Sequence, residues 1–317
     1  MTEFVGTAAD LGAEAAATVT VRVPATSANL GPGYDCFGLA IERYDEAVAS
    51  LSPSGLRVDV EGIGAGEVPT DGRHLVVRAM ALAWATAGLE LPGVHLRCRN
   101  RIPHGGGQGS SAAAIVAGLL LGRGLLPTGT ALTDDDILQL AHRMEGHPDN
   151  VAPALLGGFT LAWTRADGTA AAVRREVHPD VRAVVFTASQ SSSTHHSRAL
   201  LPQQVPHVDA AANVAAAALM VHALTTDPGY LLEATGDRLH QPYRAGAMPE
   251  SAALMQDLRS EGIAAVISGA GPSVLALVRS ELDLNRWRRP GFVAAQVPVC
   301  TAGATVTTDR SARPTSG

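Results

Sequence analysis

The chain has few aromatic residues and few cysteines. Phe, Tyr and Trp make up 4% of its 317 residues, and the three cysteines, Cys36, Cys98 and Cys300, stand far apart with no Cys-x-x-Cys pair. Scattered single cysteines of this kind fit a reducing compartment and argue against a metal cluster. We therefore expect a cytoplasmic protein, with Cys36 packed as a small apolar residue.

An excess of positive charge and a targeting segment are also missing. The chain has 24 Lys and Arg against 30 Asp and Glu, a net charge of −6, which argues against nucleic acid or an anionic membrane as a partner. Residues 1–17 lack the basic and apolar regions of a signal peptide. No uncharged apolar run reaches the roughly 18 residues of a membrane span. We expect a disordered extension at 1–17 and a disordered tail at 310–317.

A lysine is missing where a phosphate loop usually has one. Residues 103–113 read PHGGGQGSSAA and lead into an apolar run. Glycines let a backbone approach a ligand, and the start of a helix attracts phosphate. The P-loop pattern needs Lys after its last glycine, but Ser110 follows Gly109 here, and no acid about 20 residues on completes a dinucleotide-binding fingerprint. Taken alone, the segment is equally compatible with a glycine-rich connection into a buried helix. As a phosphate site, it would need Mg²⁺ held by a hydroxyl and a carboxylate.

The remaining pattern predicts a mixed α+β protein with two domains. Periodicity predicts strands at 19–23, 56–60, 94–98, 159–163, 182–187, 264–268, 274–278 and 303–308. It predicts helices at 75–87, 110–122, 133–145, 209–224, 231–239 and 251–259. At 317 residues, the chain exceeds the usual size of a single core. We place an N-terminal domain at 18–168 and a C-terminal domain at 169–309.

Two further stretches carry a family resemblance. Residues 21–35 read VRVPATSANLGPGYD, and residues 267–274 read ISGAGPSV. Together with the loop at 103–113, they resemble the three motifs of the GHMP kinases, in the same order and at similar spacing, over about residues 19–309. The first stretch and residues 145–154, EGHPDNVAPA, are most similar to the homoserine kinases of that family.

The resemblance implies a fold and an activity. The fold would be the two-domain GHMP kinase fold, with an N-terminal α+β ATP-binding domain, a C-terminal ferredoxin-like domain and the active site between them. The activity would be ATP-dependent phosphorylation of the side-chain hydroxyl of L-homoserine, giving O-phospho-L-homoserine and ADP in threonine biosynthesis. Two alternatives stay open: a kinase for a related hydroxy amino acid in specialised metabolism, and a GHMP-fold protein that binds without turnover. A homodimer is one option for its assembly.

The resemblance also implies which residues bind ATP and Mg²⁺. Ser111 and Glu145 would be the Mg²⁺ ligands. His74 stands where the family often has Asn near the adenine, although a plain helix-start histidine is an equally good interpretation. The nucleotide would be bound by His74, Pro103, Gly105, Gly106, Gly107, Gln108, Gly109, Ser110, Ser111, Gly269 and Gly271.

The acceptor site is implied in the same way. Arg198 and Arg244 would clamp the substrate carboxylate, because a guanidinium binds a carboxylate through two hydrogen bonds. Asp35 and Asp149 would meet the ammonium group and orient the hydroxyl. The other expected contacts come from Asn29, Asn150, His147 and Thr194.

Asn150 bears on the mechanism and is a feature that the homoserine kinases share, whereas two residues of the loop depart from their usual pattern. Several GHMP kinases have Asp where Asn150 stands, and an amide cannot accept the hydroxyl proton as a base, so we expect no dedicated base at this position. The homoserine kinase loop usually reads Pro-x-Gly-Arg-Gly-Leu-Gly-Ser-Ser. Here Gly106 replaces the Arg and Gln108 replaces the Leu, and we expect these changes to loosen the empty loop.

Overall fold

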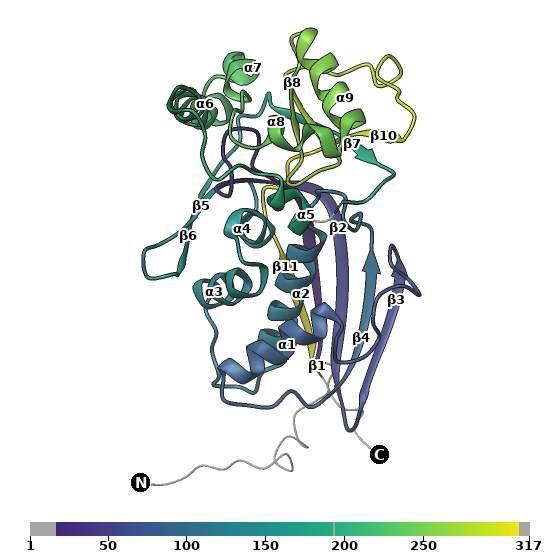
Figure 1. Ribbon diagram of the computed structural model, residues 1–317. Coiled ribbons are helices and arrows are strands. Elements are labelled where there is room, and N and C mark those ends of the chain that lie inside the picture. Colours follow the sequence, from purple (N-terminus) through teal and green to yellow (C-terminus); the bar gives the residue numbers. More distant parts are fainter. Residues whose placement is uncertain (1–16, 193, 311–317) are drawn as a thin grey trace.

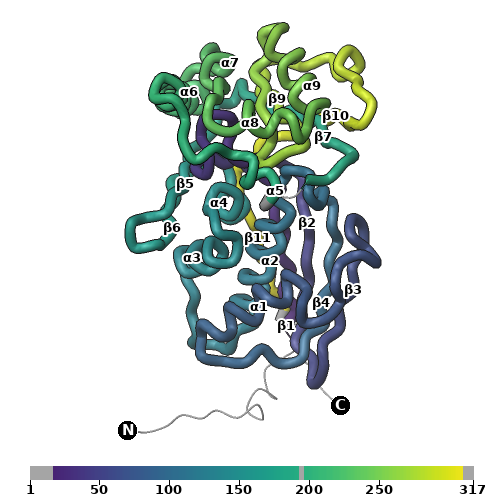
Figure 2. Tube along the Cα trace, in the orientation of Figure 1, coloured from purple at the N-terminus to yellow at the C-terminus, as the bar shows by residue number. Residues whose placement is uncertain are grey.

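The structure, a computed structural model, describes residues 17–192 and 194–310 (Figures 1 and 2). The chain forms two sheets, each with its own helices, stacked along the long axis of the molecule in Figure 1. Disorder was predicted for residues 1–17 and 310–317. Of these, residues 1–16 and 311–317 lie outside the described part of the chain. Residues Ala17 and Arg310 themselves already belong to strands.

The larger sheet has seven strands in the order β11-β1-β2-β4-β3, with β5 paired to β2 and β6 to β5. All these pairs are antiparallel except β3–β4, which is parallel. The strand bounds are β1 Ala17–Ala28, β2 Phe37–Ser52, β3 Leu56–Gly62, β4 Gly93–Asn100, β5 Phe159–Thr164, β6 Ala170–Arg175 and β11 Thr305–Arg310.

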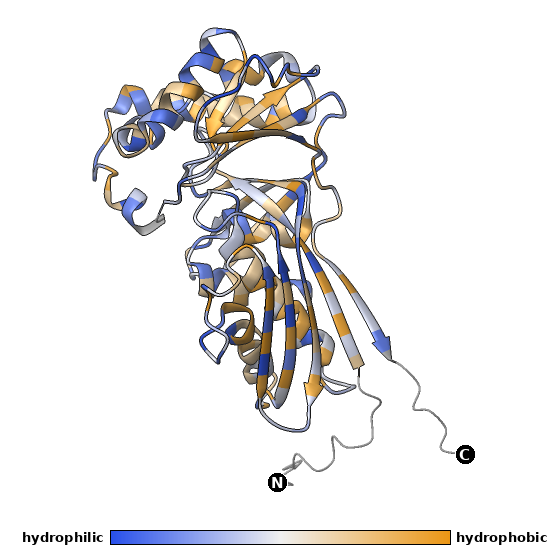
Figure 3. Cartoon of the chain, turned by 90° about the vertical axis from the view of Figure 1, so that its right-hand side faces the viewer, coloured by the Kyte–Doolittle hydropathy of each residue, from blue (hydrophilic) through white to orange (hydrophobic). Residues whose placement is uncertain are grey.

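Helices cover one face of the large sheet, and α2 is the central one. It is apolar on nearly every side, so it is buried between β1, β2 and the helices α1, α3 and α4. Figure 3 shows orange and blue residues alternating along the strands, as expected when one face packs on helices and the other meets solvent. The helix bounds are α1 Leu75–Thr86, α2 Ser110–Leu125, α3 Asp134–Glu145 and α4 Pro148–Leu156.

The second sheet has four antiparallel strands in the order β10-β7-β9-β8. In chain order this is 4-1-3-2, the ferredoxin-like arrangement that was expected. Helices lie between β7 and β8, whereas the described connection from β9 to β10 has turns only. The strands are β7 Arg182–Ala188, β8 Ala264–Ile267, β9 Val274–Val278 and β10 Phe292–Val297, and the helices are α5 Thr194–Ala199, α6 His207–Thr225, α7 Leu231–Ala234, α8 Gln241–Arg244 and α9 Pro249–Ser260.

One predicted helix was too long. The pattern predicted helix over 231–239, but α7 ends at Ala234. The hydroxyl of Thr235 donates to the carbonyl of Leu231, and Gly236 follows, a residue that disfavours helix. The carboxylate of Asp237 then accepts the backbone N–H groups of residues 239–241. A short polar side chain that caps the next turn in this way ends one helix and starts another.

The sheets divide the chain differently from the expected boundary after residue 168. Strand β6 pairs with β5, and β11 pairs with β1, so both belong to the first sheet although they follow residue 168. The first and last parts of the chain therefore build one domain together. Strands β2, β6 and β10 were not predicted. Four of the five residues at 42–46 of β2 are charged, and they hide its alternating pattern.

Helix α6 is long and apolar enough to cross a membrane by length and composition alone, with 22% of the tested stretch buried. A single helix of this kind is weak evidence for a membrane span. Its buried residues Met220, Ala223 and Leu224 pack into the hydrophobic core. In this structure α6 is thus the outer helix of the second domain.

Candidate active site

The predicted site residues meet where the two sheets join. A cavity of about 120 Å³ lies there, between the turn after β1, the glycine loop before α2, the α3–α4 junction and helices α5 and α8. It is lined by fifteen of the expected residues: Asn29, Asp35, Gly105, Gly107, Gln108, Gly109, Ser110, Ser111, Glu145, His147, Asp149, Asn150, Arg198, Arg244 and Gly269.

The glycine loop opens α2 as predicted. Gly109 caps the helix in the left-handed conformation, with φ 72°, and a Cβ there would lie 2.0 Å from the Thr26 hydroxyl. No side chain caps the first turn, so its N–H groups remain available to an anion. The loop carbonyls bond elsewhere: Thr26 N–H donates to Gln108 O at 3.1 Å, and Ser268 Oγ donates to Gly107 O at 2.6 Å.

Gln108 is not the unpartnered amide on which the prediction of a looser loop was based. Its side chain is fully buried, and Nε2 donates to Thr187 Oγ1 at 3.1 Å and to Ser273 Oγ at 3.4 Å. Its Oε1 accepts from the guanidinium of Arg43. The amide thus occupies a polar pocket where all its groups have partners, and buried amides that are paired in this way cost little. The expectation assumed an apolar surrounding, which the tertiary structure does not provide.

Ser111 and Glu145 lie together, although 34 residues separate them. Ser111 Oγ donates to Glu145 Oε2 at 2.8 Å. Glu145 is the last residue of α3, where Gly146 ends the helix in the left-handed conformation. Burial raises the pKa of Glu145, partly offset by the Ser111 hydrogen bond. A half-buried carboxylate beside a hydroxyl favours a bound cation, and oxygen ligands of this kind suit Mg²⁺.

The turn after β1 is strained. Asn29, Leu30 and Asp35 all have positive φ, at 68°, 49° and 55°, which is unfavourable for side chains other than glycine. The Asn29 amide holds the turn: Nδ2 donates to Gly269 O at 3.0 Å, and Oδ1 accepts the Asp35 N–H at 3.0 Å. A strained backbone persists only where surrounding contacts hold it in place. Here those contacts place Asp35 at the wall of the cavity.

Arg198 and Asp35 form a bidentate ion pair. Arg198 Nη2 donates to Asp35 Oδ1 at 2.6 Å and Nη1 to Oδ2 at 2.9 Å. Nη1 also donates to the Tyr34 hydroxyl at 2.8 Å. The hydrogen bond to Asp35 raises the pKa of Arg198. The pair therefore places one positive and one negative group side by side on the wall of the cavity.

Arg244 is held from behind by His240. Arg244 is 3% exposed; its Nε donates to Ser197 O at 3.0 Å and its Nη1 to His240 Nδ1 at 3.1 Å. Because arginine has only donors, Nδ1 of His240 must accept, so Nε2 carries the proton and donates to Gly31 O at 2.8 Å. Burial lowers the pKa of His240, in agreement with a neutral ring. The Tyr34 ring lies between the two arginines, with its centre 5.6 Å from Arg198 Cζ and 5.4 Å from Arg244 Cζ.

The start of α4 supplies the other polar groups. His147 Nδ1 lies 2.6 Å from Asp149 Oδ1. Burial tends to lower the pKa of His147, but the hydrogen bond and the charge of Asp149 outweigh it, and the pKa is raised. Asn150 Oδ1 accepts from Thr26 Oγ1 at 2.7 Å. This hydrogen bond fixes the Asn150 amide through its oxygen and does not use its NH₂ group. Asn150 is one of the residues that line the cavity.

His74 lies in a second cavity on the other side of the loop. That cavity, about 290 Å³, is mostly apolar and is lined by residues that include Val68, Leu75 and Ala114. His74 precedes α1, burial lowers its pKa, and its Nδ1 is buried without a hydrogen-bond partner. Ser110 and Ser111 line both cavities, so the start of α2 separates them.

Not every predicted residue faces the cavity. Pro103, Gly106 and Gly271 belong to the loops but do not line it; a Cβ on Gly106 would lie 3.0 Å from Pro103 Cβ, and one on Gly107 2.9 Å from Gly271 O. The side chain of Thr194 lies outside the described residues. Tyr34 and Ser268 lie at the site although no role was predicted for them. Their positions inside the first and third motifs were the only available signal.

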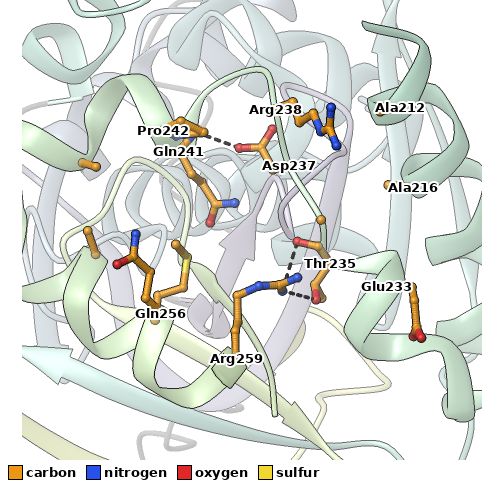
Figure 4. A pocket seen from close by; sticks show the side chains of 14 residues that line it. Ala212, Ala216, Glu233, Thr235, Asp237, Arg238, Gln241, Pro242, Gln256 and Arg259 are labelled. Atoms are coloured by element: carbon orange, nitrogen blue, oxygen red, sulfur yellow. Dashed lines mark hydrogen bonds between the residues drawn. The ribbon is translucent and has the colours of Figure 1, made fainter. Parts of the chain in front are cut away.

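A larger pocket of about 390 Å³ lies behind this site, between α6, α7, α8 and α9 (Figure 4). It holds none of the predicted residues. Asp237 and Gln241 line it, and Arg259 donates to Thr235 Oγ1 at 2.6 Å (Figure 4). Asp237 also binds the backbone of His240, the residue that holds Arg244. Two hydrogen bonds, through His240, thus connect Asp237 in this pocket to Arg244 on the acceptor side of the cavity.

Comparisons with known proteins agree with this geometry. Residues 74–158 match the GHMP kinases N terminal domain, and residues 220–290 match the GHMP kinases C terminal domain. The chain is 50% identical to a homoserine kinase of Streptomyces avermitilis over 92% of this chain and 96% of that one. It is 53% identical to a homoserine kinase of Streptomyces coelicolor over 84% and 86%. The crystal structure of homoserine kinase from Cytophaga hutchinsonii superimposes with a TM-score of 0.81 at 28% identity, over 92% of this chain and 97% of that one.

Proposed function

The chain belongs to the GHMP kinase family, and we propose that it is a homoserine kinase, which transfers the terminal phosphoryl group of ATP to the side-chain hydroxyl of L-homoserine. The products are O-phospho-L-homoserine, an intermediate of threonine biosynthesis, and ADP. One observation carries the assignment: Ser110 and Ser111, at the start of α2, line both a mostly apolar cavity and a polar one. A nucleotide and a small zwitterion would thus meet at the phosphate-binding end of a helix.

The nucleotide base would occupy the apolar cavity. It is large enough for a purine, and the unpartnered Nδ1 of His74 would form a hydrogen bond with the base. The phosphates would then lie along the free N–H groups of the loop and the first turn of α2. Gly107 and Gly109, both with positive φ, keep the loop backbone close enough for this contact.

Ser111 and Glu145 would hold Mg²⁺ beside the phosphates. Their oxygens are 2.8 Å apart, and desolvation raises the pKa of the half-buried carboxylate, an unfavourable effect that a cation would relieve. Among the described residues no group of three or more His, Cys, Asp or Glu could hold a metal. Such sparse protein ligation is usual for Mg²⁺, which keeps waters and phosphate oxygens as ligands. When bound, the ion neutralises charge on the transferred phosphoryl group.

The acceptor would bind as a zwitterion. Arg198 and Arg244 would receive its carboxylate, with the Tyr34 ring between them, and Asp35 would meet its ammonium group. The Arg198–Asp35 pair is already formed, so the two charges are oriented before the substrate enters. Preorganised groups of this kind lower the entropic cost of positioning the reactants.

The hydroxyl would attack without a dedicated base. Asn150 is an amide whose Oδ1 is occupied by Thr26, so it can orient the hydroxyl but not remove its proton. His147 is paired with Asp149, and its raised pKa favours the protonated form. Phosphoryl transfer depends mainly on positioning and charge neutralisation. The proton would then leave late, to a phosphate oxygen.

A coupled ADP-release assay with a panel of hydroxy amino acids tests the proposal. We expect the highest kcat/KM with L-homoserine. A higher value with another member of the panel would identify a kinase for a related hydroxy amino acid, and nucleotide binding without turnover on any member would indicate a binding protein. Cytoplasmic location and a homodimer stay predictions from the sequence.

A further inference from the structure

Arg43 is a half-buried cation without an ionic partner. It lies in β2, and its Nη1 donates to Gln108 Oε1 and to Thr187 Oγ1, the latter at 3.1 Å. Within residues 17–192 and 194–310, no carboxylate lies within ion-pair distance of it. Desolvation lowers the pKa of Arg43. A buried charge is costly unless its hydrogen bonds are satisfied, so this arginine needs the partners that it has.

Those partners connect parts of the molecule that are distant in sequence. Arg43 comes from the first sheet, Thr187 from β7 of the second, and Ser273 precedes β9. Gln108 lies between them: Arg43 reaches its Oε1, while its Nε2 donates to Thr187 and Ser273. Ser273 Oγ also accepts the N–H of Ala188 at 3.3 Å. The side chain of Gln108 therefore ties the phosphate loop to both domains.

The backbone on either side of Gln108 has little freedom. Its carbonyl accepts from Thr26, and the neighbouring Gly109 packs against the Thr26 side chain so closely that a Cβ would not fit. Gly107 O is bonded to Ser268. A shift of the Gln108 side chain would thus move the loop N–H groups that face the cavity.

We propose that Arg43 and Gln108 act as a positioning pair that sets the phosphate loop for nucleotide binding in this chain. Position 106 of the loop is glycine where the homoserine kinase pattern has arginine, and the guanidinium of Arg43, from β2, donates to the loop at Gln108. Gln108 in place of the usual leucine is then the matching change, because only a polar side chain can accept from Arg43. Neither residue touches the substrate in this proposal; both act through the loop backbone.

The proposal predicts that the two residues are coupled. Gln108→Leu removes the acceptor and leaves the guanidinium of Arg43 with one neutral partner, while Arg43→Met leaves Gln108 Oε1 buried and unpaired. Each variant should weaken binding of a non-hydrolysable ATP analogue by about tenfold, the loss expected for a hydrogen bond to a charged group. The double variant Arg43→Met/Gln108→Leu removes both polar groups together and should recover most of that affinity.

Calorimetry on the full-length protein measures the analogue affinity, and steady-state kinetics separates KM for ATP from KM for L-homoserine. We expect KM for ATP to rise in each single variant and KM for L-homoserine to change less than twofold. Arg57→Met is the matched control. Arg57 is an exposed residue of β3 whose ion pair, within the described part of the chain, is with Asp59, two positions away, and its replacement should leave both KM values unchanged. If Arg43→Met fails to fold, Arg43→Lys is the milder replacement, and we expect it to lose less affinity for the analogue than Arg43→Met would.

Independent, additive losses in the double variant would overturn the proposal. So would single variants that lower Tm but bind the analogue with wild-type affinity, since the pair would then be structural only. The proposal rests on ATP as the ligand of the loop, and the two failures can be told apart. If the wild-type protein does not bind the analogue at all, the proposed function fails first.

Discussion

Replacing Glu145 by glutamine should separate activity from stability. Glu145→Gln keeps the size of the side chain and can keep the hydrogen bond from Ser111 Oγ, which is 2.8 Å from Glu145 Oε2 in the structure. What it removes is one negative charge at the end of α3, next to the phosphate loop. If that charge holds Mg²⁺ at the transferred phosphoryl group, kcat should fall by about 100- to 1000-fold, the loss typical for removal of one preorganised electrostatic contact.

The stability of the unliganded protein should move in the opposite direction. Burial raises the pKa of Glu145, so the folded protein disfavours the ionised form. For an acid whose pKa is raised by folding, the unfolded chain releases the proton first, and stability is lost as pH rises through the folded-state pKa. At pH 7 the ionised carboxylate therefore costs stability that glutamine does not. We expect Glu145→Gln to have an unliganded Tm equal to or above wild type at pH 7, and the advantage to disappear below about pH 4, where the acid is protonated in both states.

Three measurements test this reasoning: the Tm of the unliganded protein against pH, kcat at saturating substrates, and the Mg²⁺ concentration for half-maximal rate. The exposed acid Glu90 gives the control variant Glu90→Gln, which should change none of them. A Glu145→Gln enzyme with near wild-type kcat at saturating Mg²⁺ would refute the ligand assignment. A marked drop in unliganded Tm at pH 7 would instead show that the carboxylate is structural.

Two other residues give predictions of the same kind. Arg244→Lys keeps the charge but replaces the planar guanidinium, whose Nε and Nη1 donate to Ser197 O and His240 Nδ1, by a single nitrogen that cannot occupy both positions. We expect kcat/KM for L-homoserine to fall about 10- to 150-fold while KM for ATP changes little, and an equal loss for ATP would place Arg244 at the phosphates. His147 has a raised pKa, so its pairing with Asp149 stabilises the fold below the unfolded histidine pKa and is lost as pH rises through the folded one. The Tm difference between wild type and His147→Gln should therefore be largest below about pH 6.5, the ordinary pKa of histidine, and should shrink as pH rises above it. A difference that is independent of pH would contradict this.

The elements with regular patterns could be predicted from the sequence, and those shaped by neighbours could not. The capping box of Thr133 and Asp136 at the start of α3 is purely local, and that helix was predicted to the residue at its end. Strand β2 was missed because its charged middle, with Arg43 and Asp45, has partners in other segments: Asp45 accepts the N–H groups of Arg101 and Ile102. The helix predicted over 231–239 failed because Asp237 binds backbone N–H groups after the turn, an effect stronger than the apolar pattern of the segment.

The family, the glycine loop at the start of α2 and the residue types needed for phosphoryl transfer could be predicted from the sequence, because these depend on short contiguous motifs. Tertiary structure alone decided which of those residues touch. Asp35 and Arg198 are 163 positions apart, and only the fold forms their bidentate pair. Gln108 looked misplaced in the sequence, and Arg43, 65 positions away, gives it a partner. Whether a polar side chain stabilises or weakens a site depends on what surrounds it when it is buried, and that environment is assembled from segments that no local pattern connects.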